Sequence, residues 1–180
     1  MAISQAVCNV FKQELLKGNH DFDGGATYYI ALYTSSATMG ATTTKYVTTN
    51  EITNTSGSAY TAGGKVCGNP SVTGGSGVST AFVDFDNVSF TSASFTANGA
   101  LIYRQDGSAP TNDAVVVLAF GGDFTASNGT FEIQFPANGG GSNSHLIIEE
   151  VLKLIKSSCI LVVPLISLKS ISKLESILRP

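Results

Sequence analysis

The 180-residue chain is long enough to bury a hydrophobic core as one domain without disulfides or metal ions. Its net charge of −3 argues against a nucleic-acid surface, because phosphate binding requires clustered lysine and arginine side chains. Glycine, serine, threonine and asparagine are abundant, tryptophan is absent and only 13% of residues are charged, which is typical of an all-β protein with many turns.

A short amphipathic helix is expected near the N-terminus. Residues 4–17 (SQAVCNVFKQELLK) place apolar side chains, Phe11 and Leu15 among them, near helical spacing. Ser4 is the predicted N-cap, and Gly18 is the predicted stop.

A polar connection, NHDFDGG, follows the helix and holds His20, Asp21 and Asp23. One imidazole and two carboxylates are possible metal ligands. In a polar turn they are more typical of a solvated loop, so we expect no metal site and no cofactor there.

The first strand is predicted at residues 27–33 (TYYIALY), which are aromatic and β-branched. Residues 34–59 then form a long segment dominated by threonine, serine and asparagine. A loop of this length in a compact domain is usually functional or contacts a partner. Two interpretations stay open: an interaction surface, or a solvated loop with a short strand near residues 46–47.

The middle of the chain offers further strands but no clear chemistry. Residues 65–67 and 78–90 are predicted strands, and the glycine-rich connection at 68–77 lacks the helix and lysine of a phosphate-binding loop. Asp84 and Asp86 fall two residues apart, hence on one face of the predicted strand. A glycosidase needs its two carboxylates across a cleft, so we expect a solvated sheet edge instead.

The organising element is a predicted hairpin at residues 99–122. Its second strand, residues 114–120 (AVVVLAF), is apolar without alternation, which predicts burial on both faces. The connection at 104–113 is expected on the surface. Turn signals at 98–99, 121–122 and 128–129 bound the neighbouring segments, and residues 130–135 and 146–148 are predicted strands.

Residues 149–180 differ from the rest of the chain. They are rich in leucine, isoleucine, lysine and serine, and they carry five basic and three acidic side chains against five basic and ten acidic in residues 1–148. The apolar run at 159–166 is short and broken by Pro164, so we expect no membrane span. An arm that docks on another subunit and a marginally structured tail both remain open.

No catalytic arrangement is visible in the sequence. The two histidines are far apart, and Cys8, Cys67 and Cys159 suggest neither a disulfide framework nor a zinc site. With no export signal recognised at the start, a reducing cytoplasm is the expected compartment. We therefore expect no enzyme activity, no catalytic residues, and no cofactor-binding or metal-binding residues.

Several blocks together resemble a family of small structural proteins of tailed bacteriophages. These blocks, in order, are FKQELLKGNHDFD, YYIALYTSSATMGATTTKY, NEITNTSGSAYTAGGK, GALIYR with AVVVLAFGGD, and FEIQFP. The resemblance covers roughly residues 1–148 and implies a virion component with a β-sandwich body and no enzyme activity. Residues 149–180 have no counterpart in the family pattern.

The expected fold is an all-β, antiparallel β-sandwich, jelly-roll-like, with a short N-terminal helix and a C-terminal extension. We divide it into an N-terminal helix at 1–20, a sandwich at 21–148 and an arm or tail at 149–180.

The expected function is that of a bacteriophage virion structural protein: a capsid decoration or cement subunit, or a head–tail or tail accessory subunit. It would self-associate as a homo-oligomer and dock on major capsid or tail proteins after assembly in the host cytoplasm, without nucleic-acid or membrane partners. The alternative is a carbohydrate- or receptor-binding β-sandwich on the virion, in which tyrosines supply stacking faces. The candidates are Tyr28, Tyr29, Tyr46, Tyr60 and Tyr103.

Overall fold

The computed structural model describes residues 2–23, 25–53, 59–74, 81–105, 111–135 and 160–162. Strands dominate them, with one short helix, which confirms the all-β prediction. In chain order the elements are β1 (Ala6–Val7), α1 (Asn9–Leu16), β2 (Tyr28–Tyr33), β3 (Lys65–Val66), β4 (Ser71–Gly74), β5 (Ala81–Asp84), β6 (Val88–Arg104), β7 (Ala114–Gln134) and β8 (Ile160–Val162).

The strands form one large sheet and one small sheet. The large sheet has the order β1-β7-β6-β2-β3, and β8 also pairs with β7. β4 and β5 form the second sheet. All pairs are antiparallel except β7–β8, which is parallel. The antiparallel prediction is confirmed for every strand pair except β7–β8. The β-sandwich with its jelly-roll arrangement and the three-part division of the chain remain predictions.

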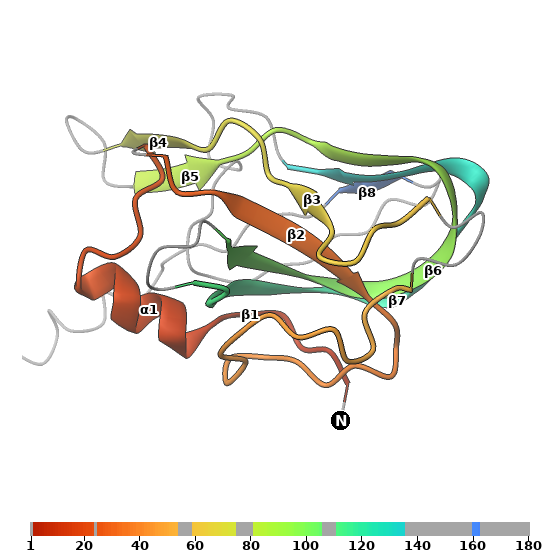
Figure 1. Cartoon of the computed structure of the whole chain (residues 1–180), viewed down its shortest axis with the longest axis horizontal. Helices are drawn as coiled ribbons and strands as arrows, with labels where there is room; N and C mark the ends of the chain where they lie inside the picture. The colour runs from red at the N-terminus through yellow and green to blue at the C-terminus, as the bar shows by residue number, and fades with distance from the viewer. Residues whose placement is uncertain are drawn as a thin grey trace, which may run out of the picture.

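The hairpin of β6 and β7 is the largest structural unit, and it bends back on itself. Figure 1 shows the two strands running side by side and curving together at one end of the molecule. Phe120 and Phe131 both belong to β7, and an extended strand would separate residues this far apart by about 36 Å. Their ring centroids are 6.1 Å apart. The hairpin therefore contributes to both sides of the core.

The bend is built from the residues that the sequence suggested as turns. The β6–β7 register shifts between Phe90 and Ala93 and again between Ala97 and Gly99. Gly121 and Asn128 have positive φ angles of 78° and 49° inside β7. The predicted turns at 98–99, 121–122 and 128–129 are wrong, because these residues supply bulges and bends within continuous strands.

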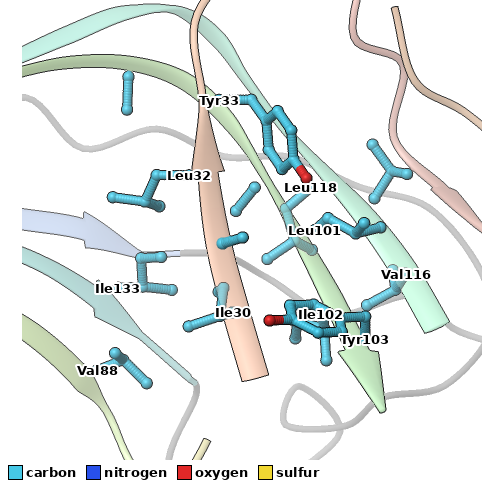
Figure 2. Close-up of a cluster of buried hydrophobic side chains, with 14 of the residues drawn as sticks. Ile30, Leu32, Tyr33, Val88, Leu101, Ile102, Tyr103, Val116, Leu118 and Ile133 are labelled. Carbon is cyan, nitrogen blue, oxygen red and sulfur yellow. The ribbon is translucent and has the colours of Figure 1, made fainter. Parts of the chain in front are cut away.

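The core lies where β2 runs beside the second half of β6. Tyr28 pairs with Arg104 and Tyr33 with Gly99, in an unbroken register. Figure 2 shows side chains from β2, β6 and β7 converging in this region. Residues 114–118 are consecutively buried, which confirms the prediction that this run is covered on both faces.

The N-terminal helix is shorter than predicted. Residues 4–17 begin extended, β1 pairs with β7, and α1 starts only at Asn9 with Cys8 as its N-cap. Ser4 is not the cap, because its hydroxyl and its amide both donate to the Met39 carbonyl oxygen. Gly18 follows the helix end with a φ of 74°, as predicted.

Other strand predictions are partly right. Residues 28–33 and 65–66 are strands, and residues 130–134 form the end of β7. The predicted strand at 78–90 is interrupted between β5 and β6, and β4 lies inside the expected connection at 68–77. Arg104 and Asp113, the ends of the expected surface turn, are buried. Residues 106–110, 146–148 and, apart from β8, 149–180 lie outside the described residues.

Candidate functional site

The long segment after β2 is held by one buried carboxylate. Glu51 is only 5% exposed and forms a β-bridge with Tyr33 at the end of β2. Its carboxylate accepts hydrogen bonds from the hydroxyls of Tyr46 and Tyr60 and from the amide of Gly63, each 2.7 Å long. These three hydrogen bonds compensate the burial of the carboxylate and give it a structural role.

Further tyrosines extend this arrangement into the sheet. The Tyr60 hydroxyl also accepts a 2.9 Å hydrogen bond from the Leu32 amide of β2. The Tyr103 hydroxyl donates to the Gly63 carbonyl over 2.9 Å, and the Tyr33 hydroxyl donates to the Val47 carbonyl over 2.7 Å. We call the set the Glu51 network, which comprises Tyr33, Tyr46, Glu51, Tyr60, Gly63 and Tyr103.

The network keeps its phenols protonated. Burial raises the pKa of Tyr60 well above its usual range, and its hydrogen bond to Glu51 raises that pKa further. Burial and then the charge of Glu51 raise the pKa of Tyr33 and Tyr103 as well. These hydroxyls therefore stay protonated and donate hydrogen bonds, which suits a structural role in holding the loop more than proton transfer.

Beside the Glu51 network lies an exposed surface formed by residues 35–36 and 47–50, which we call the loop tip. Val47 is 52% exposed there. Asn50, also in the loop tip, adopts a φ of 61°. Its carbonyl accepts a hydrogen bond from the Thr34 amide over 3.0 Å, and its side-chain amide donates to the Ser36 carbonyl. These hydrogen bonds hold the described part of residues 34–59 in place, and the interaction surface stays a prediction. The expected strand near 46–47 is reduced to a single bridge between Lys45 and Asp113.

A second surface lies on the outer face of the bent hairpin. Thr96 and Thr125 hydroxyls hydrogen-bond across the strands over 2.7 Å, and the Asn98 side chain donates to Asp123 over 2.8 Å. An open depression of about 470 Å³ lies here, lined by Ser94, Phe95, Thr96, Thr125, Ala126, Ser127 and Asn128. The Ser94, Thr96, Thr125 and Ser127 side chains in this lining carry hydroxyls, so the depression can offer hydrogen bonds to a ligand.

His20, Asp21 and Asp23 do not converge on a common point. The His20 ring is buried, its Nδ1 lies 3.2 Å from the Tyr28 hydroxyl, and its ring packs against Phe11 at 4.7 Å. Asp21 accepts from the Asp23 amide, while Asp23 accepts from the Val72 amide. The solvated-loop expectation is wrong for His20, because the aromatic cluster around it covers the ring. Within the described ranges, no three potential metal ligands gather.

Asp84 and Asp86 do not share one strand face. β5 ends at Asp84, whose carboxylate accepts from the Phe85 amide over 2.9 Å. Asp86 lies in the connection to β6, is exposed, and accepts from the Asn69 side chain. The prediction of a common face is wrong because the strand stops between the two residues.

The tyrosines proposed as stacking faces are mostly internal. Tyr28, Tyr60 and Tyr103 are buried. The Tyr103 ring stacks on Tyr46 at 4.5 Å, and the Tyr28 ring stacks on Phe22 at the same distance. Only Tyr29 and Tyr46 are half-buried.

The two described cysteines are buried free thiols. Burial raises the pKa of Cys8 to about 12, and it raises the pKa of Cys67 beyond its usual range. Thiols held in this form are poor nucleophiles. Cys159 lies outside the described residues.

Sequence reasoning missed the Glu51 network. The signal was available: Glu51 is the single acidic residue in residues 34–59. A lone carboxylate in an otherwise polar, nearly uncharged segment rich in tyrosine neighbours is a candidate for a buried acceptor.

Comparison with family models, with curated proteins and with solved structures finds no match to this chain. Within the described part of the chain, none of the helical structure has the length and apolarity needed to traverse a bilayer.

Proposed function

We propose that this chain is a bacteriophage virion structural protein, a capsid decoration or cement subunit or a head–tail or tail accessory subunit. It acts by contact rather than catalysis, through self-association and docking on major capsid or tail proteins, after assembly in the host cytoplasm. The block-by-block resemblance of residues 1–148 to tailed-phage structural proteins supports this proposal.

The observation that carries the proposal is the loop tip clamped by the Glu51 network. A buried carboxylate with three 2.7 Å hydrogen bonds stabilises a surface loop that has no catalytic group of its own among the described residues. A preordered surface binds with less loss of conformational entropy than a flexible one. Symmetric repetition then adds modest contacts over a whole particle.

Substitution of the exposed valine tests the loop tip. We expect Val47→Asp to weaken binding of the purified chain to particles lacking it by about tenfold, because a charge would enter the apolar part of the contact. Val72→Asp is the matched control, since Val72 is similarly exposed (47%, against 52% for Val47) but lies on β4. Equal binding by both variants would remove the loop tip from the contact surface.

A second candidate is carbohydrate or receptor binding on the virion. The hydroxyl-lined depression on the hairpin favours it, because sugars are recognised through such hydrogen-bonding groups. The internal packing of Tyr28, Tyr60 and Tyr103 counts against it, since their rings are not free to stack on a ligand. A glycan array with Thr96→Ala as the comparison variant decides between these two functions: binding that the variant loses supports this candidate.

A further inference from the structure

The outer edge of β7 carries an added strand from the distant C-terminal part of the chain. β6 occupies one edge of β7, and β1 pairs with the other edge only at Val116 and Val117. Farther along that edge β8 pairs in parallel, with Glu132 opposite Ile160 and Gln134 opposite Val162. Among the described residues, no strand pairs with the stretch of this edge between them.

The chain between the two paired strands is long. Twenty-five residues separate Gln134 from Ile160. A parallel pair needs a connection of roughly a dozen residues or more, and a chain of this length can reach up to about 80 Å when extended. The connection therefore allows the strand to pair with its own β7 or with that of a neighbouring copy.

We propose that β8 is an exchangeable strand, which inserts beside β7 of a second copy of this chain when subunits associate. The inference rests on the proposed function and specifies how its self-association works. Own-chain and exchanged pairings make the same backbone hydrogen bonds, so association changes which chain supplies the strand without losing contacts.

Charge and edge chemistry favour a copy of the same chain as the partner. Residues 149–180 carry an excess of two basic side chains, whereas residues 1–148 carry an excess of five acidic ones. Glu132 on the receiving edge accepts hydrogen bonds from Gln134 and Ser89, which lower its pKa. A basic arm is thus attracted to the acidic body of a neighbour, and strand addition satisfies an exposed β edge.

Cross-linking tests the exchange directly. One chain carries Gln134→Cys and a second, mass-tagged chain carries Val162→Cys, both with Cys159→Ser; Cys8 and Cys67 are buried. The two chains are mixed, allowed to associate, and treated with a short thiol-to-thiol reagent. The control replaces Gln134→Cys with Thr125→Cys, which lies on β7 outside the β8 register.

Strand exchange predicts an interchain product at least about tenfold more abundant than with the Thr125→Cys control. Assemblies that form normally but yield no more interchain product than the control would overturn the exchange and leave the proposed function standing. A chain that neither self-associates nor joins particles would overturn both.

A second variant covers the case in which the cysteine chains do not fold. Leu161→Pro removes an amide donor and disfavours strand geometry in β8 without altering residues 2–135. We expect it to dissociate the oligomer in sedimentation velocity, whereas Leu161→Val leaves the oligomer intact. Unchanged association of Leu161→Pro would contradict strand exchange.

Discussion

At the scale of single residues, Glu51 connects the described part of the loop to the residues that follow it. Burying a carboxylate is costly unless hydrogen bonds replace its water, and Tyr46, Tyr60 and Gly63 supply three. Because Tyr46 precedes Glu51 and Tyr60 and Gly63 follow it, one side chain joins the loop to the residues after 59. Tyr60 in turn accepts from the Leu32 amide and so links the same site to β2. Removing the carboxylate leaves the donors of Tyr46, Tyr60 and Gly63 without their acceptor.

We expect Glu51→Ala to lower the free energy of unfolding by about 3 kcal/mol, because the hydrogen-bond donors of Tyr46, Tyr60 and Gly63 lose their acceptor. Urea unfolding followed by far-UV circular dichroism measures the change. Asp123→Ala is the control, because this exposed carboxylate accepts one hydrogen bond from Asn98. Equal losses of unfolding free energy for the two substitutions would contradict a larger stabilising role for the buried Glu51 than for the exposed Asp123.

The tyrosines predict a pH dependence on the alkaline side. The folded state raises the pKa of Tyr33, Tyr60 and Tyr103 above the usual value, so the neutral phenols contribute stability below the unfolded pKa of about 10. That stability is lost as the pH rises through the folded values. Absorbance at 295 nm should therefore report these tyrosines ionising together with unfolding, above pH about 10. Ionisation of all six tyrosines near pH 10 with an unchanged dichroism spectrum would contradict the buried network.

Residue-level prediction from the sequence worked where the local pattern decides the outcome. Gly18 ends the helix because a positive φ suits glycine. Ser4 was misassigned because its hydroxyl competes for the Met39 carbonyl, 35 residues away. The role of Glu51 depends in the same way on Tyr60 and Gly63, whose approach only the fold creates.

At the scale of elements, glycines reveal where backbones approach closely. A Cβ added at Gly64 would lie 1.9 Å from the Ile30 carbonyl oxygen of β2, and Gly64 has a φ of 77°. A Cβ at Gly122 in β7 would meet nothing within 4 Å. The first glycine is required by the packing, and the second is not.

Alanine substitution at the two glycines should therefore differ sharply. We expect Gly64→Ala to destabilise the fold by at least about 2 kcal/mol, through backbone strain and overlap with β2. Gly122→Ala should stay within about 1 kcal/mol of the parent and lean toward stabilisation, because alanine loses less entropy than glycine in a strand. Thermal melts of both variants provide the measurement, and similar melting temperatures would contradict the close approach at Gly64.

The hairpin shows why element boundaries were harder to predict than elements. Residues 114–120 are rich in β-branched and other apolar side chains, which favour a strand, and they form the first part of β7. Asn128-Gly129 indicated a reversal, since the pair favours tight turns. In the structure the chain continues through it in β7, because β6 supplies a pairing partner on both sides of the irregularity.

At the scale of the whole molecule, the sequence was sufficient for the all-β class and for antiparallel pairing. It could not supply the bend, because the contact between Phe120 and Phe131 depends on how β7 folds over the core. The result is a strand-rich body with a clamped loop tip on one surface and a strand-accepting edge on β7. These two features are where the proposed contacts with other virion proteins and with further copies are made.

Quantitative mass spectrometry of gradient-purified virus particles, from cultures in which this chain is produced, tests the central proposal most directly. A structural subunit predicts a fixed number of copies per particle, in a simple ratio to the major capsid or tail protein and unchanged by high-salt washing. Abundant chain in the infected-cell lysate but none in washed particles would contradict the proposal.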